Sequence, residues 1–240
     1  MSRKSTSKPS PTPRQPPPAA PSPAGGRRGL LIAAGATVLV AGAGGGLYYA
    51  SRRAAAGQAA AAARRPGLAS EHAPTLGDAG AKVHIVEFLD PACETCALFY
   101  PLVKQMMAEN PGRIRLSLRH VPFHKGADEV VRMLEASRRQ DKYWQTLETL
   151  LASQSRWAPN HTARPDLARQ AIGGTGLDFA RLEADMQAPE VAQRMARDMA
   201  DAKLLNVEQT PEYFVNGRQM PSFGRQQLQA LVRQALQEAY

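Results

Sequence analysis

The chain contains very little cysteine, since Cys93 and Cys96 are the only two among 240 residues. A disulfide between them would close a very short loop and constrain little of the unfolded chain, which disfavours a purely structural bond. A tetrahedral zinc site needs two further ligands. The sequence has no second CxxC, and Pro122 between His120 and His124 predicts a loop rather than a ligating helix face. The scarcity and close spacing of the cysteines favour a redox-active pair.

Acidic residues are missing from the first 70 positions, which hold ten lysines and arginines. Residues 71–240 therefore carry 20 basic and 21 acidic groups, although the whole chain has a net charge of +9. The excess positive charge belongs to an N-terminal segment, and the remainder is nearly neutral. A surface that follows nucleic-acid phosphates is not supported by this distribution, so no nucleic-acid partner is expected.

The basic segment divides into two parts. Residues 1–28 are rich in proline, serine and basic residues and lack apolar periodicity, which predicts a disordered tail. Residues 29–50 form an uncharged run of 22 that ends before Arg52 and Arg53. As a helix this run would reach roughly 33 Å, enough for a bilayer core of about 30 Å. It predicts a single-pass transmembrane anchor.

The same run has an alternative interpretation as a cleaved export signal. Arg27 and Arg28 precede a weakly hydrophobic stretch, which resembles a twin-arginine signal. In both cases the globular part is exported, and in an oxidising compartment two isolated thiols are informative. An alanine-rich linker is predicted at 51–74, which leaves 75–240 for one domain with a full core.

The folded part reads as an α/β domain. The β-branched run "KVHIVEFLD" at 82–90 predicts a buried strand, and "RIRLSLR" at 113–119 alternates as a second strand. Helical spacing between them, ended by "NPG" at 110–112, completes a βαβ unit. The run "PEYFVNG" at 211–217 predicts a strand that enters a hairpin through its Asn-Gly pair.

Helical periodicity dominates the rest of the domain. About 80 residues after the second strand repeat their apolar positions at intervals of three or four, which predicts a helical block. Ser222 is expected to cap a final helix whose apolar face includes Leu228 and Leu231.

The cysteines are predicted to lie just after the first strand, at the start of a helix. Backbone amides and the helix dipole at that end favour a thiolate on Cys93. Cys96 lies one turn further on, the spacing at which it can attack a mixed disulfide formed on Cys93. Glu87, six residues before Cys93, could move the proton that Cys96 gains or loses, or it could be an ordinary strand-end acid.

Three stretches resemble the DsbA-like thioredoxin-fold proteins over residues 75–238: "GDAGAKVHIVEFLDPACETCALFYPLVKQM", "RIRLSLRHVPF" and "TPEYFVNGR". The resemblance implies a thioredoxin-like fold with a helical insertion at about 124–206. It also implies a cis-proline loop at Thr210-Pro211, whose backbone faces Cys93 and pairs with an extended substrate. Glu87 matches the buried acid of the family by position.

The residues between the cysteines depart from the family's strong oxidants, which carry Pro-His there. This chain has Glu94 and Thr95, and the glutamate is expected to oppose negative charge on Cys93. A threonine before the cis-proline, here Thr210, is more usual in isomerase and reductase relatives. Disulfide formation is the expected direction, and disulfide reduction or isomerisation is the alternative.

The sequence therefore predicts an exported, membrane-anchored thiol–disulfide oxidoreductase without a cofactor or a metal. Its expected partners are cysteine-containing exported proteins and a membrane redox partner that reoxidises or reduces the pair. The expected location is the bacterial inner membrane with the domain in the periplasm, or the soluble periplasm after signal cleavage. The predicted site comprises Cys93, Cys96, Glu87, Thr210 and Pro211, with Glu94 and Thr95 as tuning residues.

Two other functional classes remain open at this point. The two thiolates could capture a soft metal such as Cu(I), helped by a methionine, although the helical spacing of the methionines favours core packing. A peptide-binding adaptor with incidental thiols is the other possibility.

Overall fold

The computed structural model describes residues 46, 48–60, 62–64, 67–68 and 70–240. The predicted tail at 1–28 and most of the predicted span at 29–50 lie outside these residues. Among the residues that are described, no helix has both the length and the apolar character needed to cross a membrane. The alanine-rich stretch is helical over 48–60 and 62–64.

A five-stranded sheet forms the centre of the domain, with the strand order β1-β3-β2-β4-β5. Its strands are β1 (Thr75–Leu76), β2 (Val83–Leu89), β3 (Ile114–His120), β4 (Glu212–Val215) and β5 (Arg218–Gln219). β2 and β3 pair in parallel and the other pairs are antiparallel. The strands predicted at 82–90, 113–119 and 211–217 are confirmed.

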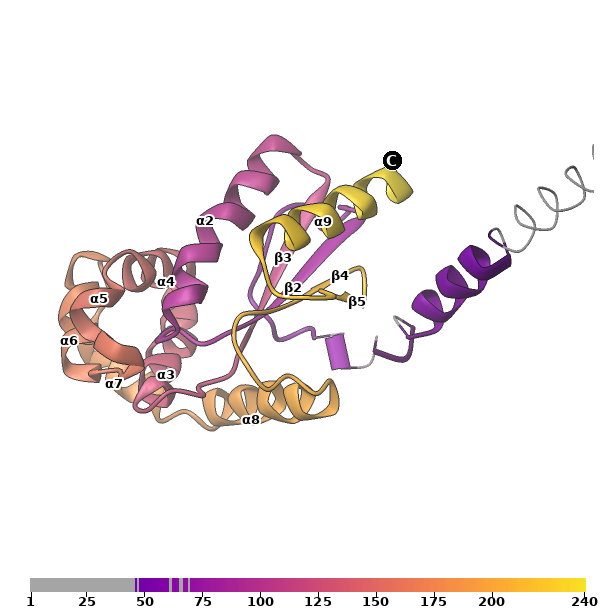
Figure 1. Cartoon of the computed structure of the whole chain (residues 1–240). Helices are drawn as coiled ribbons and strands as arrows, with labels where there is room; N and C mark the ends of the chain where they lie inside the picture. The colour runs from indigo at the N-terminus through magenta and orange to yellow at the C-terminus, as the bar shows by residue number, and fades with distance from the viewer. Residues whose placement is uncertain (1–45, 47, 61, 65–66, 69) are drawn as a thin grey trace, which may run out of the picture. The chain divides into compact units, whose positions relative to one another are not determined.

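Helices cover the sheet on both faces (Figure 1). The α-helices are α2 (Glu94–Glu109), α3 (Ala127–Ser137), α4 (Tyr143–Ala152), α5 (Gln154–Trp157), α6 (Pro165–Ala171), α7 (Phe179–Met186), α8 (Pro189–Leu204) and α9 (Arg225–Ala239). Short 3₁₀ turns lie at Arg138–Gln140, Pro159–His161 and Ile172–Gly174. In Figure 1, α2 and α9 lie on one face of the sheet, α8 lies on the other, and α3 to α7 gather at one end. The helical block lies within the predicted insertion at 124–206.

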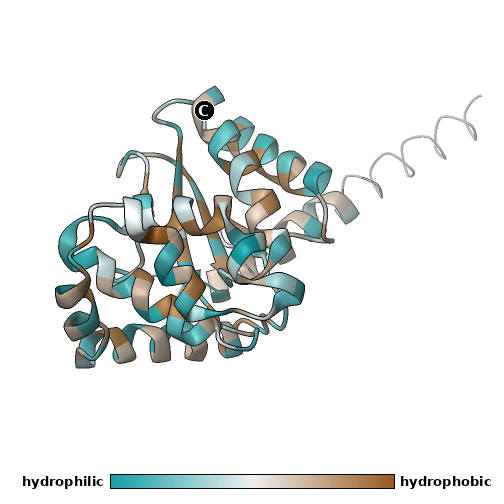
Figure 2. Cartoon of the chain, turned by 90° about the vertical axis from the view of Figure 1, so that its left-hand side faces the viewer, coloured by the Kyte–Doolittle hydropathy of each residue, from teal (hydrophilic) through white to brown (hydrophobic). Residues whose placement is uncertain are grey.

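The alternation of side chains along β2 separates two apolar clusters. Ile85 and Leu89 belong to the larger cluster, with residues of α2 and α9, whereas Val86 and Phe88 pack with Ala202 of α8. Glu87 therefore faces α2, in line with Ile85 and Leu89. In Figure 2 the helices carry both apolar and hydrophilic residues, as expected of helices with one buried face.

Two boundaries differ from the expectations. The domain packs residues ahead of 75, because Leu68 and Ala73 are buried and the Gly67 carbonyl accepts a hydrogen bond from Arg119. The prediction that Ser222 caps the last helix is wrong, since α9 begins at Arg225 without a side-chain cap. The Phe223 ring packs 4.8 Å from the Phe99 ring of α2, so the chain bends across α2 before the helix starts.

Candidate active site

The cysteine pair lies at the start of α2, which follows β2 after a tight turn. The Asp90 carboxylate accepts a hydrogen bond from the Ala92 amide at 2.8 Å, and the Asp90 carbonyl accepts one from the Cys93 amide at 3.0 Å. Cys93 then occupies the N-cap position in an extended conformation, and its side chain makes no capping hydrogen bond. Both cysteines are buried and reduced in this structure.

The two thiols have opposite acidities. The hydrogen bond from the Cys96 thiol is the largest of the effects that lower the pKa of Cys93 to about 5, against the opposing effect of burial. The Thr210 hydroxyl and the backbone amides of Cys96 and Thr95 lower it further. Burial, and then its hydrogen bond to Cys93, raises the pKa of Cys96 well above the ordinary thiol value. The negative charge of the pair is therefore held on Cys93, the sulfur at the helix end.

Glu87 lies beneath this pair on β2, opposite Leu118 of β3 and Tyr213 of β4. The side chain is completely buried, and burial is the largest cause that raises its pKa to about 8. The charge of Cys93 raises it further, while the Tyr213 hydroxyl lowers it in part, although no hydrogen bond of ordinary geometry joins the two groups. An acid with this pKa can both give and take a proton near neutral pH.

Thr210 and Pro211 face the pair from the loop before β4. The Thr210-Pro211 peptide bond is cis, as the resemblance implies. In its protonated form the Cys93 thiol donates to the Thr210 carbonyl, whose oxygen lies 3.2 Å from Sγ, so the loop lies directly beside the sulfur. Cys93, Cys96, Glu87, Thr210 and Pro211 thus meet at one place, although their roles remain predictions.

Glu94 and Thr95 lie differently from one another. The Thr95 amide contributes to the low pKa of Cys93, whereas Glu94 is not among the groups that cause this shift. The Glu94 side chain is 53% exposed, and its Oε2 lies 3.9 Å from Nε2 of His161. The expected opposition between Glu94 and a Cys93 thiolate is therefore not apparent, because solvent and a neighbouring imidazole surround the carboxylate.

Two further residues hold the site together and were missed by sequence reasoning. Buried Asp90 accepts hydrogen bonds from the His124 amide and from His124 Nδ1, which ties the start of α2 to the loop after β3. Gln154 of α5 donates to the carbonyls of Pro91 and Cys93 at 2.8 and 2.9 Å. The position of Asp90 directly after the β2 run was the one available signal, whereas nothing near Gln154 in the sequence points to the cysteines.

Within the described part of the chain, no group of three or more histidine, cysteine, aspartate or glutamate side chains is arranged to hold a metal ion.

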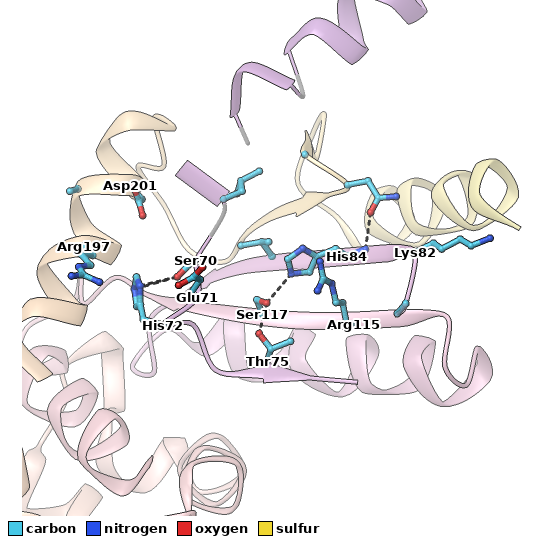
Figure 3. Close-up of a pocket in the computed structure, with 16 residues that line it drawn as sticks. Ser70, Glu71, His72, Thr75, Lys82, His84, Arg115, Ser117, Arg197 and Asp201 are labelled. Atoms are coloured by element: carbon cyan, nitrogen blue, oxygen red, sulfur yellow. Dashed lines mark hydrogen bonds between the residues drawn. The ribbon is translucent and has the colours of Figure 1, made fainter. Parts of the chain in front are cut away.

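A cavity of about 1130 Å³ lies elsewhere, on the sheet face that α8 partly covers (Figure 3). Ser117 joins Thr75 at 2.7 Å and His84 Nε2 at 2.8 Å across its polar floor. Burial, and to a lesser degree the charge of Arg115, lowers the pKa of His84 to about 4, so this imidazole is neutral at physiological pH. Neither cysteine lines this cavity, so it is separate from the thiol chemistry.

Comparisons of the sequence with known proteins identify its family. A family model described as thioredoxin matches residues 69–234. The Na(+)/H(+) antiporter NhaA of Herminiimonas arsenicoxydans is 28% identical over 144 residues, which cover 60% of the chain and 22% of the antiporter. NhaA 3 of Salinispora tropica is 32% identical over 145 residues, or 59% of the chain and 21% of that antiporter. The chain spans about a fifth of the length of these curated relatives.

Solved structures match over most of their length. A thioredoxin-like oxidoreductase from Silicibacter pomeroyi is 31% identical with a TM-score of 0.64, covering 73% of this chain and 99% of that one. Oxidised BdbD from Bacillus subtilis is 22% identical with a TM-score of 0.61, covering 70% and 94%. Wolbachia pipientis alpha-DsbA1 is 15% identical with a TM-score of 0.63, covering 74% and 97%. At the two lower identities the likeness establishes the fold alone.

Proposed function

Because the chain belongs to the thioredoxin family and is a thiol–disulfide oxidoreductase with a DsbA-like fold, we propose that it forms disulfides in exported client proteins. The observation that carries this proposal is the division of acidity within the pair. The pKa of Cys93 is lowered to about 5 while that of Cys96 is raised. A stabilised Cys93 thiolate favours the reduced form, which makes the Cys93–Cys96 disulfide a stronger oxidant.

The oxidative half of the reaction begins with the Cys93–Cys96 disulfide. A client thiolate attacks Cys93, forms a mixed disulfide and releases Cys96 as a thiolate. Because the pKa of Cys96 is raised and that of Glu87 is about 8, the protonated carboxyl of Glu87 can give its proton to this leaving sulfur. A second client thiolate then attacks the client sulfur and releases the Cys93 thiolate. The client loses two electrons, which the reduced pair passes to a redox partner in the membrane.

The loop at Thr210 orients the client in this scheme. The Thr210 carbonyl lies 3.2 Å from the Cys93 Sγ, so an extended client segment that pairs with this backbone brings its cysteine to the same sulfur. The expected reduction potential lies between about −270 mV and about −120 mV, the interval between thioredoxin and the strong oxidant DsbA.

Anchoring in the bacterial inner membrane, with the domain in the periplasm, is part of the same proposal. It is supported by the 22-residue uncharged run at 29–50 and by the antiporters among the relatives, which are membrane proteins by name. Fractionation with a protease-accessibility assay should find the domain membrane-bound and accessible from outside. A soluble mature protein that starts near residue 57 would instead mean that the run is a cleaved signal.

The test of the chemistry uses full-length protein. The oxidised protein is expected to transfer its disulfide to a reduced, unfolded thiol protein, and equilibration with glutathione buffers should give a potential within the interval above. A potential below that of thioredoxin would make the protein a reductase. Protein that retains stoichiometric copper or zinc and exchanges no disulfide would favour the metal-binding alternative.

A further inference from the structure

The cavity of about 1130 Å³ lies over β2 and β3, on the face of the sheet that points away from the thiols. Val86 lines it and belongs to the apolar cluster opposite the one that contains both cysteines. Across the parallel pair of strands, His84 lies opposite Arg115 and Val86 lies opposite Ser117. These four side chains, all of which line the cavity, form its floor.

The two ends of the cavity differ in charge. Figure 3 shows Glu71 and Asp201, the two acidic residues that line it, at the end formed by α8. Arg115 lies further along the strands (Figure 3), and among the described residues no acidic side chain lines the cavity there. This second, acid-free end is lined by Thr75, Lys82, His84, Arg115 and Ser117.

Arg115 has no anionic partner at the acid-free end. The half-buried side chain makes no salt bridge within the described residues, and its Nε is buried without a hydrogen-bond partner among them. Arg119, four positions later on the same face of β3, is by contrast neutralised by Asp198 and Asp201. A bound anion would supply Arg115 with the opposite charge and the hydrogen-bond acceptor that the protein gives to Arg119.

The floor beside Arg115 is polar and uncharged. The Ser117 hydroxyl lies 2.8 Å from His84 Nε2 and 2.7 Å from the Thr75 hydroxyl. Burial, and then the charge of Arg115, lowers the pKa of His84 to about 4, so the imidazole is neutral at physiological pH. Hydroxyl hydrogens can rotate toward a bound oxygen. The floor therefore offers hydrogen bonds to an anion without competing with it for Arg115.

Lys82 adds positive charge at the same end without filling it. Its Nζ donates to the Ala239 carbonyl at 3.1 Å and lies 4.7 Å from the centre of the Tyr240 ring. Figure 3 shows this side chain directed away from Arg115. Lys82 therefore raises the electrostatic potential in the cavity and leaves the space beside Arg115 open.

We propose that the acid-free end binds a phosphate group, with the Arg115 guanidinium as its main contact and the Ser117 and Thr75 hydroxyls as further donors. A guanidinium donates two parallel hydrogen bonds to phosphate, and a tetrahedral phosphate has oxygens left for the hydroxyls, whereas a carboxylate has only two oxygens in all. The cavity is much larger than a single phosphate ion, so the group is carried by a larger polar molecule. Its source is either the head group of an anionic phospholipid or a soluble phosphate ester.

The test measures the binding of inorganic phosphate to the full-length protein in nonionic detergent by calorimetry, at constant ionic strength. We expect Arg115→Gln to weaken phosphate binding about tenfold or more, as the loss of a hydrogen bond between charged groups implies. Acetate, which offers only a carboxylate, should bind more weakly than phosphate to the wild type.

Arg233→Gln is the matched control. Arg233 lies on α9, is exposed and does not line the cavity. The substitution removes the same charge from the protein, so phosphate attracted by the basic N-terminal segment is affected equally in the two variants. The control should keep the wild-type affinity for phosphate, and both variants should exchange disulfides at the wild-type rate, because neither residue belongs to the thiol site.

Reconstitution distinguishes the two sources of the phosphate. The protein is placed in vesicles of phosphatidylcholine alone or of phosphatidylcholine with phosphatidylglycerol. If the difference in phosphate affinity between wild type and Arg115→Gln disappears when phosphatidylglycerol is present, the lipid head group occupies the site. If the difference persists in both vesicles, the natural ligand is a soluble phosphate ester.

Three results would overturn the phosphate site while the disulfide chemistry stands. They are the absence of phosphate binding to the wild type, equal affinities in Arg115→Gln and Arg233→Gln, and acetate binding as tight as that of phosphate.

Discussion

The molecule buries a carboxylate on each face of its sheet, and the two have opposite surroundings. Glu87, beneath the thiols, has no hydrogen-bond partner for either oxygen among the described residues, and its pKa is raised to about 8. Asp198, on the opposite face, is 2% exposed. Burial alone would raise its pKa, but hydrogen bonds from His72 and the His120 amide, together with the charge of Arg119, hold the pKa below its usual value.

The opposite pKa shifts of Glu87 and Asp198 show that burial alone does not determine whether a carboxylate has a structural or a chemical role. Around Asp198 the partners satisfy the charge and join three segments, because Arg119 of β3 also pairs with Asp201 and with the Gly67 carbonyl. The carboxylate there is structural and remains ionised. Around Glu87 no cation and no ordinary hydrogen bond among the described residues offsets the cost of burying the charged carboxylate. Its pKa is therefore raised to a value at which the carboxyl can exchange its proton near neutral pH, where the thiols react.

The largest expected effect comes from breaking the compensated cluster. Arg119→Met should destabilise the protein by about 3–5 kcal/mol, because it leaves Asp198 and Asp201 near the sheet without their cation. Arg115→Met is the matched control, since Arg115 lies on the same face of β3 but makes no salt bridge within the described residues. Urea unfolding of the oxidised proteins measures both. A loss below about 1 kcal/mol for Arg119→Met would show that the cluster contributes little.

The raised pKa of Glu87 should make the stability of the protein depend on pH. Between about pH 4.5, the ordinary value, and about pH 8 the native state holds the Glu87 proton more tightly than the unfolded state does, so stability falls as pH rises. The loss is at most about 5 kcal/mol, and smaller in the oxidised protein, where Cys93 carries no charge.

Glu87→Gln should remove this fall in the free energy of unfolding. Unfolding curves of the wild type and the variant are measured at pH 5, 6, 7 and 8, and their difference separates the contribution of Glu87 from that of other titrating groups. Parallel curves across that range would mean that Glu87 titrates normally in the folded state.

Glu87, unlike Asp198, is also expected to affect the rate of disulfide exchange. Glutamine cannot supply an acidic proton, so Glu87→Gln should slow release of the Cys96 thiolate by about tenfold to a hundredfold at neutral pH. The rate of mixed-disulfide formation by the oxidised protein, followed from pH 5 to pH 9, measures the effect. The pKa of Cys93, read from thiolate absorbance in the reduced protein, should stay near its wild-type value in the same variant, because Glu87, with a pKa of about 8, is uncharged while Cys93 titrates near 5. An unchanged rate profile would assign Glu87 a packing role.

Local pattern made much of this arrangement predictable. The β-branched run around Ile85 and the alternation around Leu116 specify strands in any globular context, and Cys93-x-x-Cys96 after such a strand specifies thiols at a helix start. The cis bond at Thr210-Pro211 came through the resemblance, since sequence spacing carries no information on peptide isomers.

Contacts between distant segments were not predictable in this way. Asp90 and His124 are 34 positions apart and Gln154 reaches Cys93 across 61, so only the assembled fold brings them together. The expected cap at Ser222 failed for a related reason, because the packing of Phe223 on Phe99 overrode a local preference. Long-range packing decides such positions.

The smallest effect is expected from a third carboxylate, Glu94, whose side chain is 53% exposed, unlike the buried Glu87 and Asp198. Solvent screens this charge, so Glu94→Gln should lower the pKa of Cys93 by only a fraction of a unit. For a two-electron couple about 30 mV corresponds to about 1.4 kcal/mol, so the potential should rise by less than about 15 mV. His161→Gln should shift the potential slightly in the other direction, since the imidazole beside Glu94 is lost, and the double variant should lie between the two. Equilibration with glutathione buffers resolves these differences when all variants are measured together. A shift above about 30 mV in Glu94→Gln would mean that this carboxylate acts on the Cys93 thiolate directly and that exposure does not protect the sulfur from it.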